Sequence, residues 1–206
     1  MTERMSAAHE AVELGDLDAL EDLLAAGLDP EEEWHGLTLL MHAVLGEADA
    51  FDQTGEWDAD ATALLLKHGA DPTRPTAHGT GITPEHVAWT HGHDLATRLF
   101  TAWRRERGLP EVAAPARPPT LHLTEAAITH IAAAIDGRPE PALAYRIMAT
   151  HRQPSGVWFH GTLTTRRLPD DVSLPFGPVT VLVDKFSAPY LDGVTHDHDG
   201  AYRFSR

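Results

Sequence analysis

Hydrophobic and polar positions follow different patterns in the two halves of the chain. In the first half, leucine-rich segments end at glycines, as in residues 23–27 and 64–69, and this predicts short helices that share one core. In the second half, apolar residues gather in β-rich runs at 143–148, 157–163 and 179–183, which predict strands. The sequence therefore predicts an α+β protein with two domains, an all-α first domain and a β-rich second one.

A helical pattern also opens the second half. Thr124 is a suitable N-cap for an amphipathic helix with apolar positions at Ala127, Ile128, Ile131 and Ile135. A short helical turn at 188–191 and a last strand at 201–204 complete the elements that we expect in the second half, with glycine and proline in the gaps.

The first half of the chain repeats itself. Residues 9–16 match residues 86–93, and residues 36–43 are a weaker copy in which Leu39 replaces proline and Met41 replaces histidine. The first interval, from position 9 to position 41, is 32 residues, and the second, from 41 to 86, is 45. A period of 32 to 33 residues with a helical pattern is typical of a repeat stack, so the second repeat carries an excess of 13 residues.

The sequence motifs of the repeat resemble those of a known family. Residues 81–93, GITPEHVAWTHGH, resemble the ankyrin consensus, in which a G-x-T-P-x-H-x-A box opens a helix and a Gly-His pair closes it. Residues 64–71, LLLKHGAD, resemble the ankyrin signature L-L-L-x-x-G-A-D. Thr83 is a suitable helix cap with Pro84 at the first helical position. The resemblance implies three ankyrin repeats over about residues 5–107, a fold that binds proteins.

Ten of the extra residues lie between the two helices of the second repeat, in the acidic segment 46–60. Long loops in a compact stack are usually functional or disordered, and exposed aromatic residues commonly anchor interfaces. We expect an insertion near 47–60 to capture a partner, and its deletion to abolish capture without unfolding the stack. The alternative that both aromatics cover the repeat helices stays open. The candidate partner-binding residues are Trp34, in the hairpin before the second repeat, Phe51, Glu56 and Trp57.

The net charge of −15 is concentrated in the first half. Residues 1–108 contain 21 Asp and Glu against 7 Lys and Arg, a net of −14, whereas residues 109–206 contain 10 against 9, a net of −1. Such an acidic domain repels phosphate backbones, so we expect no nucleic acid partner. Two interpretations of the acidity stay open: it attracts a basic protein partner, or it keeps an elongated domain in solution.

A linker rich in proline and alanine at residues 108–120 separates a first domain at 1–107 from a second at 121–206. The second domain contains the motifs LTEAA at its start, VLVD at 181–184, YLDG at 190–193 and YRF at 202–204. In these motifs it resembles the HesB-like fold of A-type iron–sulfur carriers. The resemblance implies a β-rich HesB-like fold.

The iron–sulfur carriers hold their cluster with three cysteines, and this chain has no cysteine. Pro154 stands at the position that matches the first ligand, in the segment 153–156, and the cysteine-containing tail has no counterpart after Ser205. The resemblance therefore implies a degenerate carrier fold, for which we expect no cofactor. The absence of cysteine also excludes disulfides and thiolate metal sites.

Histidine and carboxylate side chains could replace the missing thiolates. His196 and His198 alternate with aspartates, and alternate residues of a strand share one face, so a metal-binding or iron–sulfur assembly accessory protein is the alternative function. A polar turn between Gly193 and Gly200 explains the same residues without a metal, and we predict no metal site. His9 and the matching His86 are interpreted as structural residues of the repeat.

Motifs of enzymes are absent, including a Walker A loop, H-E-x-x-H and G-x-S-x-G. Asp170 and Asp171, in an expected loop, are interpreted as solvated charges, and Arg104, Arg105 and Arg107 as a complement to a helix dipole. We therefore expect a non-enzymatic protein-interaction or adaptor protein without catalytic residues, with a hydrolase as the weakest alternative. No apolar run predicts a membrane span or signal peptide, so we expect a cytoplasmic location and no membrane partner.

Overall fold

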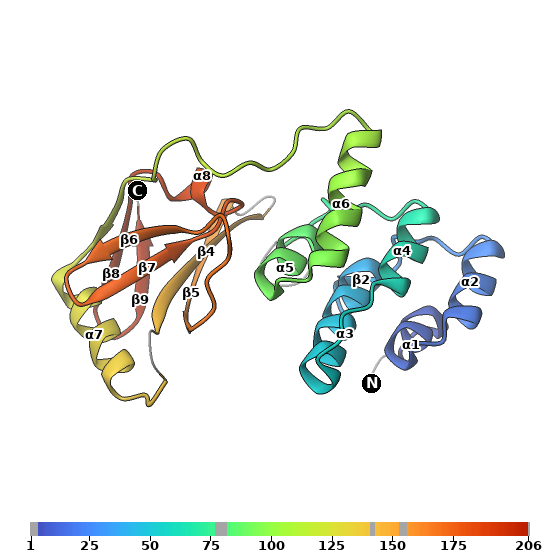
Figure 1. Ribbon diagram of the computed structural model, residues 1–206, viewed down its shortest axis with the longest axis horizontal. Coiled ribbons are helices and arrows are strands. Elements are labelled where there is room, and N and C mark those ends of the chain that lie inside the picture. Colours follow the sequence, from blue (N-terminus) through green and yellow to red (C-terminus); the bar gives the residue numbers. More distant parts are fainter. Residues whose placement is uncertain (1–3, 77–81, 141–142, 153–155, 206) are drawn as a thin grey trace. The chain divides into compact units, whose positions relative to one another are not determined.

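The computed structural model describes residues 4–76, 82–140, 143–152 and 156–205 (Figure 1). The chain divides into two compact units, Met1–Glu111 and Val112–Arg206, and the division falls inside the proline-rich segment. Two positions used above, Gly81 and Pro154, lie outside the described residues. In the described part of the chain, no helix has the length and apolar character that crossing a membrane requires.

Three consecutive helix pairs build the first unit, and α3 contacts both α1 and α5. Ser6, Thr38 and Thr83 each cap the first helix of a pair by accepting a backbone N–H three residues later, which is why each helix begins where it does. The pairs are α1 (Ala7–Leu14) with α2 (Leu17–Ala25), α3 (Leu39–Thr54) with α4 (Asp60–Lys67), and α5 (Pro84–His91) with α6 (Asp94–Glu106).

The first unit contains a short β-hairpin, so the prediction of an all-α first domain is wrong in this detail. Strands β1 (Glu33–Trp34) and β2 (Leu37–Thr38) pair antiparallel ahead of α3. The two residues between them, His35 and Gly36, have φ values of 48° and 74°, the positive angles of a tight hairpin turn.

The core of the first unit comes from equivalent positions of the helix pairs. Its fully buried side chains include Leu20 of α2, Leu65 of α4 and Phe100 of α6. Met41, which replaces the histidine of the repeat motif, is also buried, at 2% exposure. The leucines are thus shared between neighbouring helix pairs, and no pair has a core of its own.

The second repeat differs from our expectation of a long loop. Helix α3 continues to Thr54 and ends at Gly55, whose φ is 76° and whose N–H bonds to the Phe51 carbonyl at 2.7 Å. Residues 45–51 include strong helix formers, and Ala48 is buried at 4% exposure, so local propensity and packing both favour the helix. Most of the extra residues therefore lengthen a helix, and a five-residue connection, 55–59, joins it to α4.

The second unit contains a four-stranded sheet with the order β5-β4-β7-β6. Strand β4 pairs antiparallel with β5 and parallel with β7, and β6 pairs antiparallel with β7. The strands are β4 (Ala144–Arg152), β5 (Gly156–Thr164), β6 (Val172–Phe176) and β7 (Val179–Val183).

A three-stranded sheet with the order β3-β8-β9 completes the second unit, together with two helices. Ile131 of the amphipathic helix is fully buried against the strands, as its spacing indicated, and Leu191 of the short helix is also fully buried. These elements are β3 (Leu121–Leu123), α7 (Glu125–Asp136), α8 (Ala188–Leu191), β8 (Val194–His198) and β9 (Tyr202–Ser205).

The interpretation of residues 193–200 as a polar turn is wrong. Five of these residues form β8, which pairs parallel with β3 and antiparallel with β9. Local composition pointed to a turn, but burial of Val194 and His196 in the unit's core stabilises an extended backbone.

The interpretation of Asp171 as a solvated loop charge is also wrong. Its two carboxylate oxygens accept from both terminal nitrogens of Arg146, each at 2.7 Å, and the two side chains are only 3% and 5% exposed. Arg146 lies on β4 among apolar residues, so its charge requires a partner, and the loop after β5 supplies it. Asp170 matches the expectation better, since its side chain is 40% exposed.

Candidate protein-binding surface

The carboxylate of Glu47 ties three helices together in the first unit. Its Oε1 accepts the backbone N–H of Thr62 at 2.9 Å, and its Oε2 accepts the Thr62 hydroxyl at 2.7 Å and lies 3.0 Å from His93 Nε2. Glu47 is on α3, Thr62 on α4, and His93 is the N-cap of α6. Because all three side chains are buried, this network fixes where the connection between α3 and α4 runs.

We expect Glu47→Gln to lower the free energy of unfolding by about 1–3 kcal/mol, because an amide leaves one buried donor facing another donor. Urea denaturation followed by circular dichroism measures this change. Glu56→Gln, at an exposed position of the same segment, is the matched control and should change stability by less than about 0.5 kcal/mol. Equal effects of the two substitutions would contradict the structural role of Glu47.

The two aromatic residues of the extra segment fold back towards the helices. The rings of Phe51 and Trp57 stack with centroids 4.1 Å apart, and Trp57 stacks on His93 at 4.2 Å. Both aromatic side chains remain half-buried, so each still presents a part of its surface. The alternative that both aromatic residues cover the repeat helices therefore applies to the inner face of each ring.

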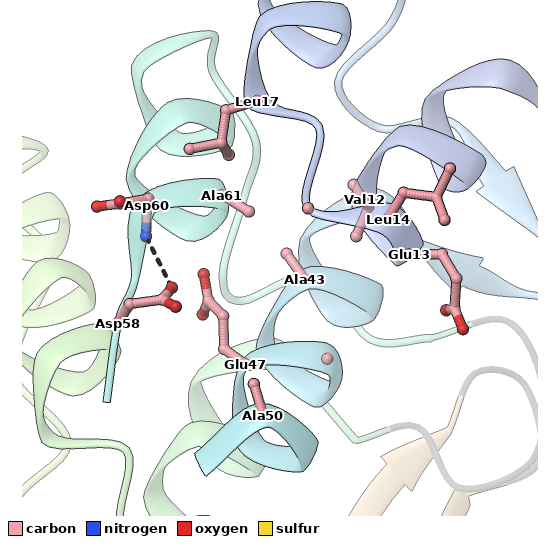
Figure 2. Close-up of a pocket in the computed structure, with 12 residues that line it drawn as sticks. Val12, Glu13, Leu14, Leu17, Ala43, Glu47, Ala50, Asp58, Asp60 and Ala61 are labelled. Carbon is pink, nitrogen blue, oxygen red and sulfur yellow. Dashed lines mark hydrogen bonds between the residues drawn. The ribbon is translucent and has the colours of Figure 1, made fainter. Parts of the chain in front are cut away.

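A hollow of about 270 Å³ lies between the α1–α2 turn, α3 and the start of α4 (Figure 2). Its apolar lining includes Val12, Leu17, Ala43, Ala50 and Ala61. Figure 2 shows the side chains of Glu47 and Asp58 directed into this space from opposite walls. Its lining residues include the acidic residues Glu13, Glu47, Asp58 and Asp60 and no lysine or arginine. The carboxylates of Glu13 and Asp60 point away from the hollow in Figure 2, and Glu13 Oε2 lies 2.8 Å from His42 Nε2.

A second hollow, of about 510 Å³, lies on the other side of the 55–59 connection. Asp58 and Asp60 line both hollows, so this short segment forms a ridge between them. The remaining lining residues of the second hollow are Trp57, Ala59, Ala63, Leu95, Arg98 and Leu99. Trp57 thus contributes a wall to a hollow in addition to its stack on His93.

The charged residues around this surface are mostly acidic, with Arg98 as a basic residue in the second hollow. Residues 5–66 contain 16 Asp and Glu and no Lys or Arg. Several basic residues further along the unit are already paired, Lys67 with Glu21 and Arg104 with Glu85. The local potential is therefore negative and attracts cationic groups.

The structure separates Trp34 from the other candidates. It lies in the β1–β2 hairpin at the start of α3, with its ring 6.0 Å from that of His9 and 4.4 Å from that of His35. Phe51 and Trp57 lie at the other end of α3, about 20 Å away at 1.5 Å per helical residue. Glu56 is exposed beside Trp57. Three of the four predicted residues therefore lie together and Trp34 does not.

Sequence reasoning missed the residues that shape the first hollow, namely Glu13, Leu14, Asp58 and Asp60. Leu14 is 72% exposed at the α1–α2 turn, which makes it the most exposed large apolar side chain in the described part of the chain. The long stretch without lysine or arginine was the available signal. It could have indicated the acidic face, but only the fold brings Glu13 and Asp60 to one hollow.

His196 and His198, the metal ligands of the alternative interpretation, make contacts with other side chains of the second unit. His196 is fully buried, its Nε2 lies 3.2 Å from the Tyr145 hydroxyl, and its Nδ1 lies 3.3 Å from the Arg203 carbonyl oxygen. Burial lowers the pKa of His196 and raises that of Tyr145, which favours the neutral form of both. His198 stacks on His130 at 3.8 Å. Among the described residues, no three histidine or acidic side chains are grouped as metal ligands would be.

No protein-family model matches the chain. A Rhodobacter capsulatus protein described as an uncharacterized protein in the nifU 5' region is 34% identical over 77 residues, which cover 37% of this chain and 73% of that protein. A Cereibacter sphaeroides protein of the same description is 32% identical over 77 residues, with the same coverage. The chain therefore belongs to the family of these two proteins.

Solved structures similar to parts of the chain include both kinds of protein that the sequence resembles. Escherichia coli SufA, involved in the biosynthesis of iron–sulfur clusters, is 21% identical with a TM-score of 0.37, covering 41% of this chain and 78% of its own. The ankyrin repeat domain of Bcl-3 is 24% identical with a TM-score of 0.41, covering 48% and 39%. The ankyrin repeat domain of human ASB11 is 26% identical with a TM-score of 0.39, covering 48% and 40%. These TM-scores are below 0.5, so the likenesses add no residue roles to this chain.

Proposed function

We propose that this chain is a non-enzymatic interaction protein whose first unit binds a basic segment of a protein partner. The binding surface is the ridge formed by Glu56, Trp57, Asp58 and Asp60 together with the first hollow, and we name it the ridge surface. The observation that carries the proposal is the lining of that hollow, which includes four acidic residues and no lysine or arginine.

The lining of the hollow favours a lysine or arginine side chain. These residues have an apolar stem and a cationic end, so the stem can cover apolar surface while the charge stays near solvent or a counter-ion. The lining of the first hollow offers both parts, because Val12 and Ala61 are apolar and Asp58, whose carboxylate points into the hollow in Figure 2, is anionic. Trp57 beside it supplies an aromatic surface of the kind that anchors interfaces.

The experiment uses the full chain as immobilised bait in an extract of its native cells, with captured proteins quantified by mass spectrometry. We expect Asp58→Asn/Asp60→Asn to reduce capture of the main partner about tenfold, because the double substitution removes two charges from the ridge surface while each amide keeps its size. Raising the salt concentration from 0.1 to 0.5 M should reduce capture in the same direction.

The matched control is Asp18→Asn/Asp22→Asn, which removes the same charge from exposed positions of α2. Capture by this control should equal that of the unchanged protein. If both variants lose capture equally, the acidity acts only through net charge. If neither does, the ridge surface is not the binding element.

Deletion of residues 47–60, which the sequence suggested as a test, is unsuitable. It would remove the Glu47 carboxylate that bonds to Thr62 and His93, together with the buried Ala48. Loss of capture after such a deletion would report unfolding as well as binding. The metal-binding alternative would in turn require His196 to give up its bonds to Tyr145 and Arg203, so the geometry favours the interaction function.

A further inference from the structure

Strand β5 forms an edge of the four-stranded sheet in the second unit. It pairs with β4 without interruption over nine residues, from Gly156 opposite Arg152 to Thr164 opposite Ala144. On its other side it pairs with no strand in the part of the chain that the structure describes. None of its nine residues is buried, and Trp158 is 48% exposed.

The composition of β5 lacks the features that usually protect a sheet edge. Natural edge strands are kept short or carry charged residues, proline or bulges, because an open edge is a template for another strand. Strand β5, with the sequence GVWFHGTLT, has no charged residue and no proline, and its register with β4 has no bulge. The opposite edge, β6, has five residues including Pro175, and β9 has four including Arg203. Only β5 of these edges is long and unprotected.

We infer that the edges of β5 in two copies of this chain pair with each other in an antiparallel dimer. Antiparallel pairing of identical strands about a two-fold axis satisfies both open edges at once and closes the assembly. Because β5 has no charged side chain, two copies of this edge can pair without setting like charges opposite each other. The pairing would join the two sheets into one continuous sheet of eight strands.

The register of this pairing follows from the strand itself. Pairing centred on His160 places all nine residues of β5 opposite a residue of the second copy, and every other centre shortens the ladder. It sets Trp158 opposite Thr162, and Phe159 opposite Gly161, so that two large aromatic side chains never meet. His160 then lies opposite its own counterpart.

The first test is the molar mass of the full chain in solution, measured by analytical ultracentrifugation at about 50 μM. One chain has a mass of 22.5 kDa, so the dimer should have 2 × 22.5 = 45 kDa. We expect His160→Lys to halve the measured mass, because it sets two cations opposite each other at the axis. Thr129→Lys, at an exposed site of α7, adds the same charge elsewhere and should leave the mass at 45 kDa. A mass of 22.5 kDa for the unchanged protein, or a dimer that His160→Lys leaves intact, overturns the inference.

The second test uses the absence of cysteine from the chain, because one introduced thiol can react only with that of another copy. Residues directly opposite in an antiparallel pair have Cα atoms about 4.5–5.5 Å apart, within the range of a disulfide. We expect His160→Cys to form a disulfide-linked dimer on mild oxidation. Trp158→Cys should do so far more slowly, because its counterpart would lie four residues along the ladder, about 13 Å away. Equal rates at the two positions, or no dimer at either, contradict the proposed register.

Discussion

Replacing Asp171 by asparagine is expected to lower the free energy of unfolding of the second unit by about 3–5 kcal/mol. The substitution keeps the size of the side chain but leaves the guanidinium of Arg146, which is 5% exposed, without a counter-charge. It also weakens the acceptor for the Leu168 backbone N–H, which now bonds to Asp171 Oδ2 at 2.7 Å. Amide hydrogen exchange along β4 and β7 measures the change in this unit separately from the first one.

Asp170→Asn is the natural control, because the neighbouring carboxylate is 40% exposed and lies 3.5 Å from Lys185. Its effect should be less than about 1 kcal/mol. A double variant, Arg146→Met/Asp171→Leu, removes both charges and should recover most of the loss, since a buried ion pair is rarely more stabilising than apolar residues of similar volume. If Asp171→Asn has no larger effect than Asp170→Asn, the Arg146–Asp171 pair is not formed in solution.

Local signals in the sequence were sufficient for the start and the end of α5 in the first unit, although not for the length of α3. Thr83 followed by Pro84 predicts a helix start, and Thr83 does cap α5. A cap involves residues only three positions apart, so its chemistry can be recognised without knowledge of the fold. The same holds for the left-handed glycine that ends the helix, Gly92, with φ of 65°.

The misjudged elements depend on partners far away in the sequence. Asp171 is paired with a residue 25 positions earlier, and β8 is a strand because β3, more than 70 positions earlier, lies beside it. In both cases the local composition, polar and rich in aspartate, indicated a loop. The fold overrides this preference, because a buried Arg146 requires a carboxylate and β3 requires a neighbour.

The candidate surface was predictable in part for the same reason. The acidic segment with Phe51 and Trp57 is visible in the sequence, and the structure stacks these two rings. The hollow beside them also needs the α1–α2 turn, about 45 residues away, and no pattern in one sequence shows that approach. Glu47 looked like one more surface acid, although it is buried and bonded to two other helices.

Replacing Gly161 by alanine is expected to destabilise the second unit by about 3 kcal/mol, an effect typical of overpacking. A Cβ at this position would lie 1.7 Å from the Tyr145 hydroxyl oxygen and 2.2 Å from Cζ. The Tyr145 ring is 2% exposed and its hydroxyl lies 3.2 Å from His196 Nε2, so it cannot move aside without losing both packing and that bond. Hydrogen exchange of the β4 and β5 amides measures the loss.

The cause of this loss can be separated from any backbone requirement of Gly161 by a double-mutant cycle with Tyr145→Leu. Once the ring is gone, alanine has room, and Gly161→Ala should be neutral or stabilising by about 0.5–1 kcal/mol, because glycine is unfavourable inside a strand. Gly137→Ala is a control in the same unit, since its Cβ would meet the Ala133 carbonyl oxygen at an ordinary 3.5 Å. An unchanged loss in the Tyr145→Leu background would mean that the backbone, and not the aromatic ring, requires glycine at position 161.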